Sequence, residues 1–233
     1  MIDRSTNATI TTVVFDVNET LSDMAPMATR FADLGAPPHL ARLWFASLLR
    51  DGFARTVTGR PERFAVLAAE VLRGVLHGVE IDRPVDAAVE HVLDGFADLS
   101  VYPDVPAGVR DLRAAGLRLV TLSNGSAGVG ERLLGRAGLR DAFEQVLSVE
   151  DAGAWKPAAA AYEYAARACG TTVDEMILVA VHPWDLDGAA RAGMRTAWID
   201  RTGAPYPQYC TSPDHTVRAL PELAAALRPA SRA

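Results

Sequence analysis

Hydrophobic and polar residues alternate in two different ways along the chain. A short apolar run at 12–17 contains β-branched and aromatic residues and predicts a buried strand. Between about 23 and 100, apolar residues recur at spacings of three and four, which is the pattern of amphipathic helix faces. Turn-forming residues at Gly52, 59–61 and 82–84 divide this stretch into several helices.

From Tyr102 onward, predicted strands and helices follow one another in turn. The strands are expected at 117–122, 145–148, 176–181 and 195–199, and the helices at 106–115, 127–137, 157–169, 185–192 and 220–227. This alternation predicts a doubly wound α/β fold with a parallel sheet covered by helices on both faces. We therefore predict a core domain of residues 1–22 and 101–233, with a helical-bundle cap of residues 23–100 inserted after the first strand.

Composition narrows the classes of protein to which the chain can belong. The chain has 233 residues, of which 49% are hydrophobic and 22% charged, as is typical of an ordinary soluble globular protein. A net charge of −6 provides no basic field for nucleic acid. No apolar stretch is long enough for a membrane span and no signal peptide opens the chain, so we expect a cytoplasmic protein. The two cysteines fit neither a metal site nor a disulfide framework, and no metal or cofactor is expected.

The residues whose side chains could take part in catalysis lie where the predicted strands end. Asp16 ends the first strand, 123–125 (Ser-Asn-Gly) follow the second, Lys156 follows the third and 182–185 (His-Pro-Trp-Asp) follow the fourth. Because ligands bind beyond the carboxyl ends of strands in open parallel sheets, these groups are expected to converge. A carboxylate, hydroxyl and amide donors, an ammonium and a second carboxylate suit covalent catalysis with Asp16 as the nucleophile.

Each of these residues also has a structural interpretation. Lys156 before Pro157 could simply begin a helix, and Asp185 could be the N-cap of the helix that follows it. The 123–125 segment could be only a turn. His182 could be a structural histidine, and the aromatic residues among the candidates could be core packing: Phe45, Phe64 and Tyr162.

The order of these groups resembles the haloacid dehalogenase superfamily of hydrolases, and in particular its (S)-2-haloacid dehalogenase branch. The matching positions are Asp16 with Thr20, Ser123 after an apolar strand, Lys156 before a proline and Asp185 after the fourth strand. Further similar segments are 122–126, 137–141, 147–149, 155–157, 184–185 and 198–203. The resemblance covers essentially the whole chain, including the helical insertion, which would be the family's cap.

The resemblance implies a metal-independent reaction on a small 2-haloacid. Asp16 would displace halide from C2 to give an ester, and water would then release the 2-hydroxyacid. Lys156 would keep Asp16 ionised, and Asp185 would orient Lys156 or the water. Thr20, Ser123 and Asn124 would hold the carboxylate and the substrate, and the remaining substrate contacts would come from Tyr162, His182, Phe64 and Trp184. The resemblance also implies a homodimer formed through the cap.

Two departures separate the chain from the phosphatases of this superfamily. Asn18 stands where phosphatases have an acid that gives and takes a proton, and an amide cannot do so near pH 7. Val181 replaces the first acid of their magnesium-binding pair, which removes a hard oxygen ligand. A Mg²⁺-dependent phosphatase acting on a small metabolite remains the alternative enzyme.

Further departures lie at the substrate end of the expected site. The family has an arginine directly after the Leu-Trp of the first long cap helix, where this chain has Phe45. A phenylalanine is a far weaker anion partner than a guanidinium. Arg42, Arg50 or Arg55 could substitute. His182 stands in place of an asparagine and 18–19 in place of an aromatic-glycine pair. The sequence therefore does not identify the substrate. A catalytically silent protein with this fold is a third alternative.

Overall fold

A six-stranded parallel sheet forms the centre of the molecule. The computed structural model describes residues 8–227, so the first seven and last six residues assigned to the core lie outside the described residues. The strand order is β3-β2-β1-β4-β5-β6, and every neighbouring pair is parallel. This confirms the predicted doubly wound sheet. The strands are β1 (Thr12–Phe15), β2 (Arg118–Ser123), β3 (Gln145–Ser148), β4 (Met176–Ala180), β5 (Arg195–Ile199) and β6 (His215–Val217).

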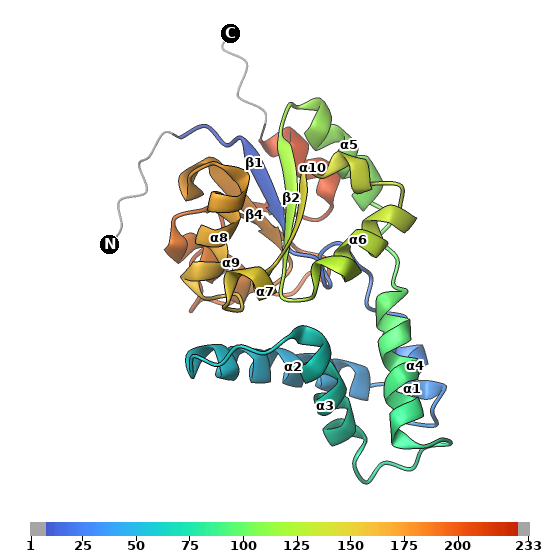
Figure 1. Cartoon of the computed structure of the whole chain (residues 1–233). Helices are drawn as coiled ribbons and strands as arrows, with labels where there is room; N and C mark the ends of the chain where they lie inside the picture. The colour runs from blue at the N-terminus through green and yellow to red at the C-terminus, as the bar shows by residue number, and fades with distance from the viewer. Residues whose placement is uncertain (1–7, 228–233) are drawn as a thin grey trace.

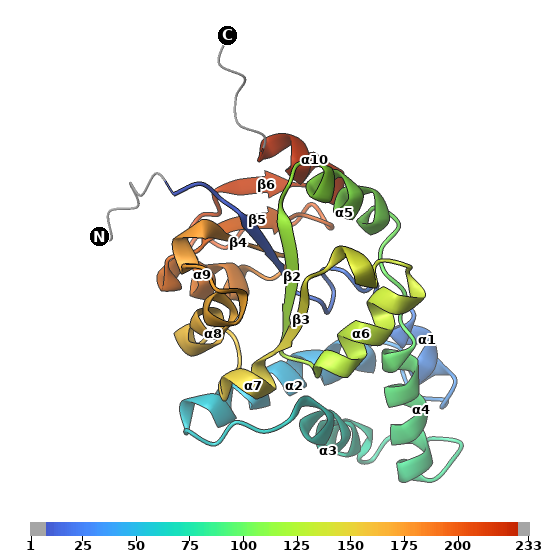
Figure 2. The same cartoon turned by 45° about the horizontal axis from the view of Figure 1, so that its top comes forward.

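Alternate residues of the strands enter two separate hydrophobic cores, one on each face of the sheet. Val14 points into the core beneath α8 (Ala159–Cys169) and α9 (Pro183–Ala192). Its neighbours Val13 and Phe15 point into the opposite core. That face is covered by α5 (Val105–Ala114), α6 (Ala127–Arg136) and α10 (Leu220–Ala226). Figures 1 and 2 show these two helical layers on either side of the strands.

Four helices form a separate layer beyond the sheet (Figure 1). They are α1 (Met27–Ala32), α2 (Leu40–Val57), α3 (Phe64–Leu76) and α4 (Val85–Ala97). Trp44 lies at their centre, fully buried, where its indole N–H donates to the Ala68 carbonyl over 3.0 Å. The proposed division of the chain into core and cap assigns all four helices to the cap.

The two segments that connect core and cap pair with each other. Ser22 and Val101 form an antiparallel bridge. The Asp23 N–H donates to the Ser100 carbonyl over 2.8 Å, and the Tyr102 N–H donates to the Leu21 carbonyl over 2.9 Å. The chain therefore leaves and re-enters the core at one place, which supports a boundary between core and cap near these residues.

Trp155 of the core inserts between α2 and α3 of the cap. Its indole N–H donates to the Glu62 carbonyl over 2.9 Å, and its backbone N–H donates to the Thr56 hydroxyl over 3.1 Å. The ring stacks on Phe64 at a centroid distance of 6.0 Å. A Cβ atom on Gly52 would lie 2.3 Å from this ring, so α2 reaches the core only because position 52 has no side chain.

The structure differs from the predicted elements at several places. Gly52 was expected to separate two helices, but it lies inside α2, which continues unbroken to Val57. A short helix that was not predicted, α7 (Val149–Ala152), follows β3. β6 falls between the predicted strand at 195–199 and the predicted helix at 220–227, in a segment for which no strand was predicted. β1 ends at Phe15, so Asp16 is the first residue after the strand. Helix α9 begins at Pro183 and its N-cap is His182, so the expectation that Asp185 caps this helix is wrong. Asp185 lies within the first turn because Pro183, with its fixed φ, already occupies the first helical position.

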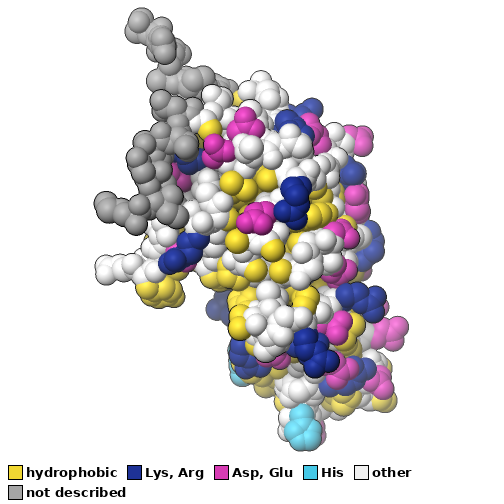
Figure 3. Space-filling view, turned by 60° about the vertical axis from the view of Figure 1, so that its left-hand side comes forward, with side chains coloured by type: hydrophobic (Ala, Val, Ile, Leu, Met, Phe, Trp, Pro, Cys, Tyr) yellow, Lys and Arg dark blue, Asp and Glu magenta, His cyan; other side chains and the backbone are white. Residues whose placement is uncertain are grey.

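Charged side chains of both signs are interspersed over the face that Figure 3 shows, with hydrophobic side chains between them. That face carries no continuous field of one sign. No helix within residues 8–227 is long and apolar enough to cross a membrane.

Replacing Gly52 with alanine should loosen the contact between cap and core. Because the added Cβ would overlap the Trp155 ring, we expect Gly52→Ala to lower the free energy of unfolding by about 1–3 kcal/mol in urea titrations. Gly74→Ala is the matched control, since a Cβ there meets nothing within 4 Å and alanine favours a helix by about 1 kcal/mol over glycine. Equal effects of the two substitutions would contradict this account of the interface.

Candidate active site

Asp16 lies at the carboxyl end of β1, between β2 and β4, and both of its carboxylate oxygens are occupied. Oδ2 accepts a hydrogen bond from the Thr20 hydroxyl over 2.6 Å. Oδ1 is 2.8 Å from the ammonium of Lys156. The Thr20 hydroxyl in turn accepts from the Val181 N–H over 3.1 Å, which ties it to the end of β4. The carboxylate is thus fixed from two sides, and only 4% of Asp16 is exposed.

Lys156 is fully buried and lies between two acids. Its Nζ is 2.8 Å from Asp16 and 2.6 Å from Oδ2 of Asp185. Asn124 holds the lysine backbone, since its side-chain oxygen accepts from the Lys156 N–H over 2.9 Å and its amide nitrogen is 3.4 Å from the Lys156 carbonyl. The Ser123 hydroxyl accepts from the Gly125 N–H over 2.9 Å. Asn124 and Ser123 therefore shape the loops around the lysine, and neither has a hydrogen bond to Asp16 here.

Tyr162 lies behind Asp185 and has no exposed surface. Its hydroxyl donates to Oδ1 of Asp185 over 2.7 Å and is also 2.9 Å from the Asp185 carbonyl oxygen. Both oxygens of Asp185 are therefore occupied, one by Lys156 and one by Tyr162. We expected Tyr162 to contact substrate, and in the structure its hydroxyl supports Asp185.

The three buried charges shift each other's pKa values. Burial raises the pKa of Asp16, but the charges of Lys156 and His182 outweigh burial and hold the pKa below its ordinary value. Burial also raises the pKa of Asp185, and here repulsion from Asp16 adds to it, so that the Asp185 pKa stays above its ordinary value despite Lys156. Burial lowers the pKa of Lys156, yet two facing carboxylates raise it overall. Asp16 is consequently an ionised carboxylate at neutral pH, with a charged ammonium beside it.

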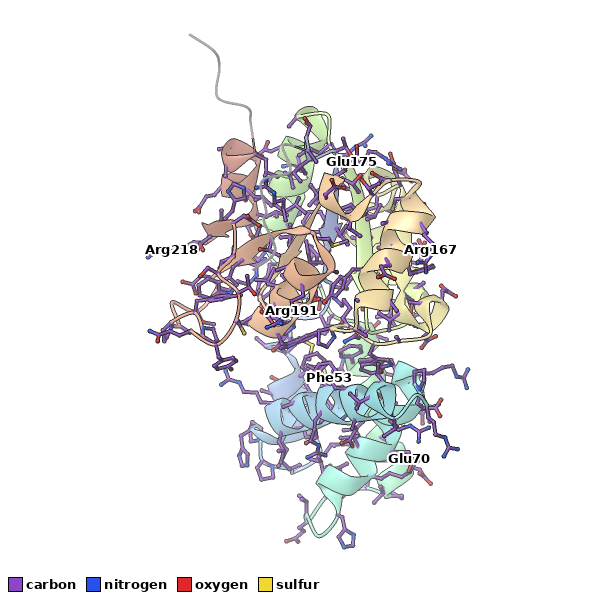
Figure 4. All side chains as sticks on the ribbon, turned by 90° about the vertical axis from the view of Figure 1, so that its left-hand side faces the viewer. Phe53, Glu70, Arg167, Glu175, Arg191 and Arg218 are labelled. Carbon is purple, nitrogen blue, oxygen red and sulfur yellow. The ribbon has the colours of Figure 1, made fainter. Side chains whose placement is uncertain are left out.

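His182 faces three oxygen atoms with a single ring nitrogen. Its Nε2 is 3.1 Å from the Asn18 carbonyl, 3.6 Å from Glu19 Oε2 and 3.7 Å from Asp16 Oδ2. Because all three are acceptors, this environment favours a proton on Nε2. The ring stacks on Trp184 at 5.1 Å, and Trp184 meets Phe53 of α2 at 4.9 Å. Figure 4 shows Phe53 on the side of α2 that faces the core.

Glu19 has a φ of +64°, in the left-handed region that side chains other than glycine rarely adopt. The resemblance implies a glycine at this position, and glycine adopts this conformation without strain. In this chain the strained residue carries a carboxylate beside His182. Burial is the main cause that raises the Glu19 pKa, whereas the charges of His182 and Arg42 lower it in part.

A cavity of about 760 Å³ lies between cap and core, next to this cluster. Glu19 and His182 line it from the core, and Phe45 lines it from α2. Phe64 does not line it, because its ring is buried between Phe96 at 5.3 Å and Trp155 at 6.0 Å. The other lining residues are Asp23, Met24, Ala25, Met27, Ala28, Pro38, His39, Ala41, Arg42, Ala46, Leu49, Tyr102 and Thr202.

The three arginines of α2 lie in different surroundings. Arg42 lines the cavity, and its charge acts on Glu19. Arg50 is largely exposed and pairs with Asp51 over 2.8 Å. Arg55 faces Glu62 at 4.0 Å. Of these alternatives to the absent cap arginine, Arg42 is the one that borders the cavity.

Sequence reasoning gave no role to Arg201, which supports the nucleophile loop. One terminal nitrogen donates to the Thr20 carbonyl over 2.8 Å, and the other is 3.0 Å from Asp104. The guanidinium also lies 3.8 Å from the centre of the Tyr102 ring. Its only signal in the sequence was its place in the 198–203 segment. Among the residues that the structure describes, no three His, Cys, Asp or Glu side chains are grouped so as to hold a metal ion.

A doubly wound core with a buried acid at the end of its first strand, facing a lysine beneath an inserted helical cap, defines a class of capped α/β hydrolases. The model of one such family, the haloacid dehalogenase-like hydrolases, matches residues 10–193. The chain belongs to this family.

Individual members of the family are similar over nearly the whole chain. An (S)-2-haloacid dehalogenase from Pseudomonas sp. (strain YL) is 31% identical over 211 residues, covering 89% of this chain and 90% of that protein. Haloacetate dehalogenase H-2 from Moraxella sp. (strain B) is 29% identical and covers 89% of this chain and 93% of that protein.

Solved structures agree with this assignment. The structure of a dehalogenase with an intermediate complex superimposes with a TM-score of 0.88 at 28% identity, covering 96% of this chain and 99% of that one. The L-2-haloacid dehalogenase from Xanthobacter autotrophicus with covalently bound chloropropionic acid gives a TM-score of 0.85 at 26% identity, covering 96% and 100%.

Removing the lysine should destabilise the folded state, because two buried carboxylates would lose their positively charged partner. We expect Lys156→Met to lower the free energy of unfolding at pH 7 by about 3–5 kcal/mol, because it leaves the charges of Asp16 and Asp185 without a partner. Both carboxyls then have pKa values above those of the unfolded chain, so the folded state binds more protons and the variant gains stability as pH falls from 7 towards 4. In the unchanged protein the pKa of Asp16 is lowered, so ionised Asp16 stabilises the folded state at neutral pH. This contribution to stability begins to be lost only when the pH falls below 3.8, the ordinary pKa of an aspartate.

The control for this experiment is Arg167→Met, since Arg167 is an exposed cation on α8, 4.0 Å from Glu163 (Figure 4). Urea titrations at several pH values should show little change for Arg167→Met. If Lys156→Met gave the same stability and the same pH slope as the control, the proposed charge balance of the site would be incorrect.

Proposed function

We propose that the chain is a metal-independent 2-haloacid dehalogenase that works through a covalent ester on Asp16. The observation that carries this proposal is the pairing of Asp16 with the fully buried Lys156 at the carboxyl end of β1. This pairing keeps the carboxylate ionised and fixed, as nucleophilic attack requires. The named relatives supply the reaction class, because both act on halogenated acids and one structural relative holds a substrate-derived group covalently.

In the first step an oxygen of Asp16 attacks C2 of the haloacid from the side opposite the halogen. The new carbon–oxygen bond forms as the carbon–halogen bond breaks, so the halide leaves with its electron pair and the configuration at C2 inverts. Thr20 and Lys156 hold the carboxylate in place for this attack. The product of the step is an ester between Asp16 and the 2-hydroxyacid.

In the second step water attacks the carbonyl carbon of the Asp16 ester. The negative charge that develops on the carbonyl oxygen is stabilised by the ammonium of Lys156 or the hydroxyl of Thr20, which lie at the two carboxylate oxygens. Collapse of this intermediate breaks its bond to the 2-hydroxyacid. Of the two protons of the attacking water, one passes to the departing alkoxide oxygen and the other to solvent, so that Asp16 is regenerated as a carboxylate. Asp185 keeps Lys156 in position throughout, while Tyr162 holds Asp185.

The phosphatase alternative lacks its two required groups. The side chain at position 18 is an amide, and the side chain at position 181 is a valine. Neither can serve as the proton-transfer acid or the metal-binding carboxylate of that mechanism. Asp16 and Lys156 are intact and paired, which counts against a catalytically silent protein.

The proposal is tested with 2-bromopropionate and a chelator, by measuring bromide release and the mass of the protein. We expect Asp16→Asn to lower bromide release by at least about a thousandfold, because an amide is a poor nucleophile. Asp111→Asn, an exposed acid on α5, is the matched control and should release bromide at the normal rate. In a single turnover in ¹⁸O-water, the label should enter Asp16 and be absent from the first product molecule. Label in that first product would mean direct attack by water and would exclude the ester.

Arg42 should supply the positive charge that binds the substrate carboxylate. We expect Arg42→Met to raise KM for 2-bromopropionate by roughly tenfold to a hundredfold, because one charge-assisted hydrogen bond contributes about 1.5–3 kcal/mol. Arg50→Met, which removes an exposed arginine of the same helix, should leave KM unchanged. Equal KM values for the two variants would place the carboxylate elsewhere.

We also infer a homodimer and a cytoplasmic location for the protein. The dimer follows from the resemblance to the family, and the cap helices carry four exposed apolar residues, Leu43, Val57, Val66 and Val85. A molar mass of one chain in light scattering at micromolar concentration would contradict it. The cytoplasmic location follows from the sequence alone, and fractionation of cells that produce the protein would test it.

A further inference from the structure

The cavity between cap and core has a mainly apolar wall on the cap side. Arg42, Phe45, Ala46 and Leu49 lie three or four residues apart on α2, so they share one face of that helix. The segment that leads into and begins α1 adds Met24, Ala25, Met27 and Ala28. Apart from Arg42, all of these side chains are apolar, and the other polar cap residues that line the cavity are Asp23 and His39.

The volume of the cavity, about 760 Å³, is large for a two- or three-carbon acid. Cavities of roughly 300–1,000 Å³ are typical of sites that hold drug-sized ligands. A small haloacid would leave most of this apolar wall in contact with water, so it would gain nothing from the methionines and Phe45.

The cavity borders the catalytic cluster on the core side, although Asp16 and Lys156 do not themselves line it. His182 and Glu19 line the cavity, and Nε2 of His182 lies 3.7 Å from Oδ2 of Asp16. A substrate whose C2 atom lies at Asp16 would therefore extend past His182 towards α1 and α2. The carboxylate would meet Arg42 in this cavity, and the substituent on C2 would lie against the apolar wall beside it.

We propose that this cavity binds the C2 substituent of the substrate, and that the chain acts on 2-haloacids with an apolar substituent of several carbons. The proposal rests on the function proposed above and names its substrate class. Charged residues border the cavity at Glu19, Asp23 and Arg42, where the carboxylate of such an acid can meet Arg42. The apolar wall then receives the alkyl or aryl part.

The first test is a series of 2-bromoacids of increasing length: 2-bromopropionate, 2-bromobutanoate, 2-bromohexanoate and 2-bromooctanoate. Each buried methylene should raise kcat/KM about fourfold, the factor that corresponds to ~0.8 kcal/mol of transfer free energy. We expect kcat/KM, measured by bromide release, to rise at least as far as 2-bromohexanoate. Values that stay level or fall with length, while 2-bromopropionate is turned over, would overturn the proposal.

The second test fills the cavity. Ala46→Trp adds a large side chain on the lining face of α2, and we expect it to lower the ratio of kcat/KM for 2-bromohexanoate over 2-bromopropionate at least tenfold. Ala54→Trp adds the same side chain at an exposed position of α2 that does not line the cavity, and the ratio should stay unchanged. If Ala46→Trp instead dissociated a dimer and left the ratio unchanged, the occupant would be a second copy of the chain and the proposal would fail.

A binding experiment separates this proposal from the proposed function. Calorimetric titration with hexanoate and propionate, which carry no leaving group, should show tighter binding of hexanoate by at least tenfold, and Ala46→Trp should remove the difference. If no bromoacid released bromide but this pattern held, the dehalogenase function would be wrong and the assignment of the cavity would stand. Equal affinities for the two acids would reject the assignment.

Discussion

The site depends on the burial of one ammonium between two carboxylates. An unpaired charge of this kind is too costly to remove from water, so Lys156 can be buried only if Asp16 and Asp185 both face it. Asp16 follows β1, and Asp185 lies in the first turn of α9 after β4. The pairing of β1 with β4 brings these acids together. The loop after β3 must therefore place Lys156 between them.

The same loop also fixes the position of the cap. Trp155, the residue before Lys156, inserts between α2 and α3, where it is held by two hydrogen bonds and by the close approach at Gly52. Lys156 itself is held by Asn124 from the loop after β2. Trp155 and Lys156, which are neighbours in the chain, thus link the position of α2 to the ion pairs of the active site. The helix that lines the cavity is consequently positioned from within the active site.

The convergence of Asp16, Lys156 and Asp185 could be predicted from the sequence because the carboxyl ends of parallel strands share one edge of the sheet. The contacts of Asn124, Tyr162 and Phe64 could not be predicted, since the direction of a side chain on a loop or helix depends on what packs against it. The same holds for Arg42, which differs from Arg50 and Arg55 only in its surroundings. β6 was missed because a three-residue edge strand has no clear hydrophobic pattern.

The burial of Lys156 has a practical consequence for protein chemistry. The sequence contains no other lysine, since the other 22 members of its 23 basic Lys and Arg residues are arginines. No lysine ammonium is therefore available at the surface for conjugation, cross-linking or acetylation. A reagent specific for lysine can react with this side chain only when the buried site opens locally or the chain unfolds. Labelling kinetics at this one amine would thus report directly on how often the active site opens.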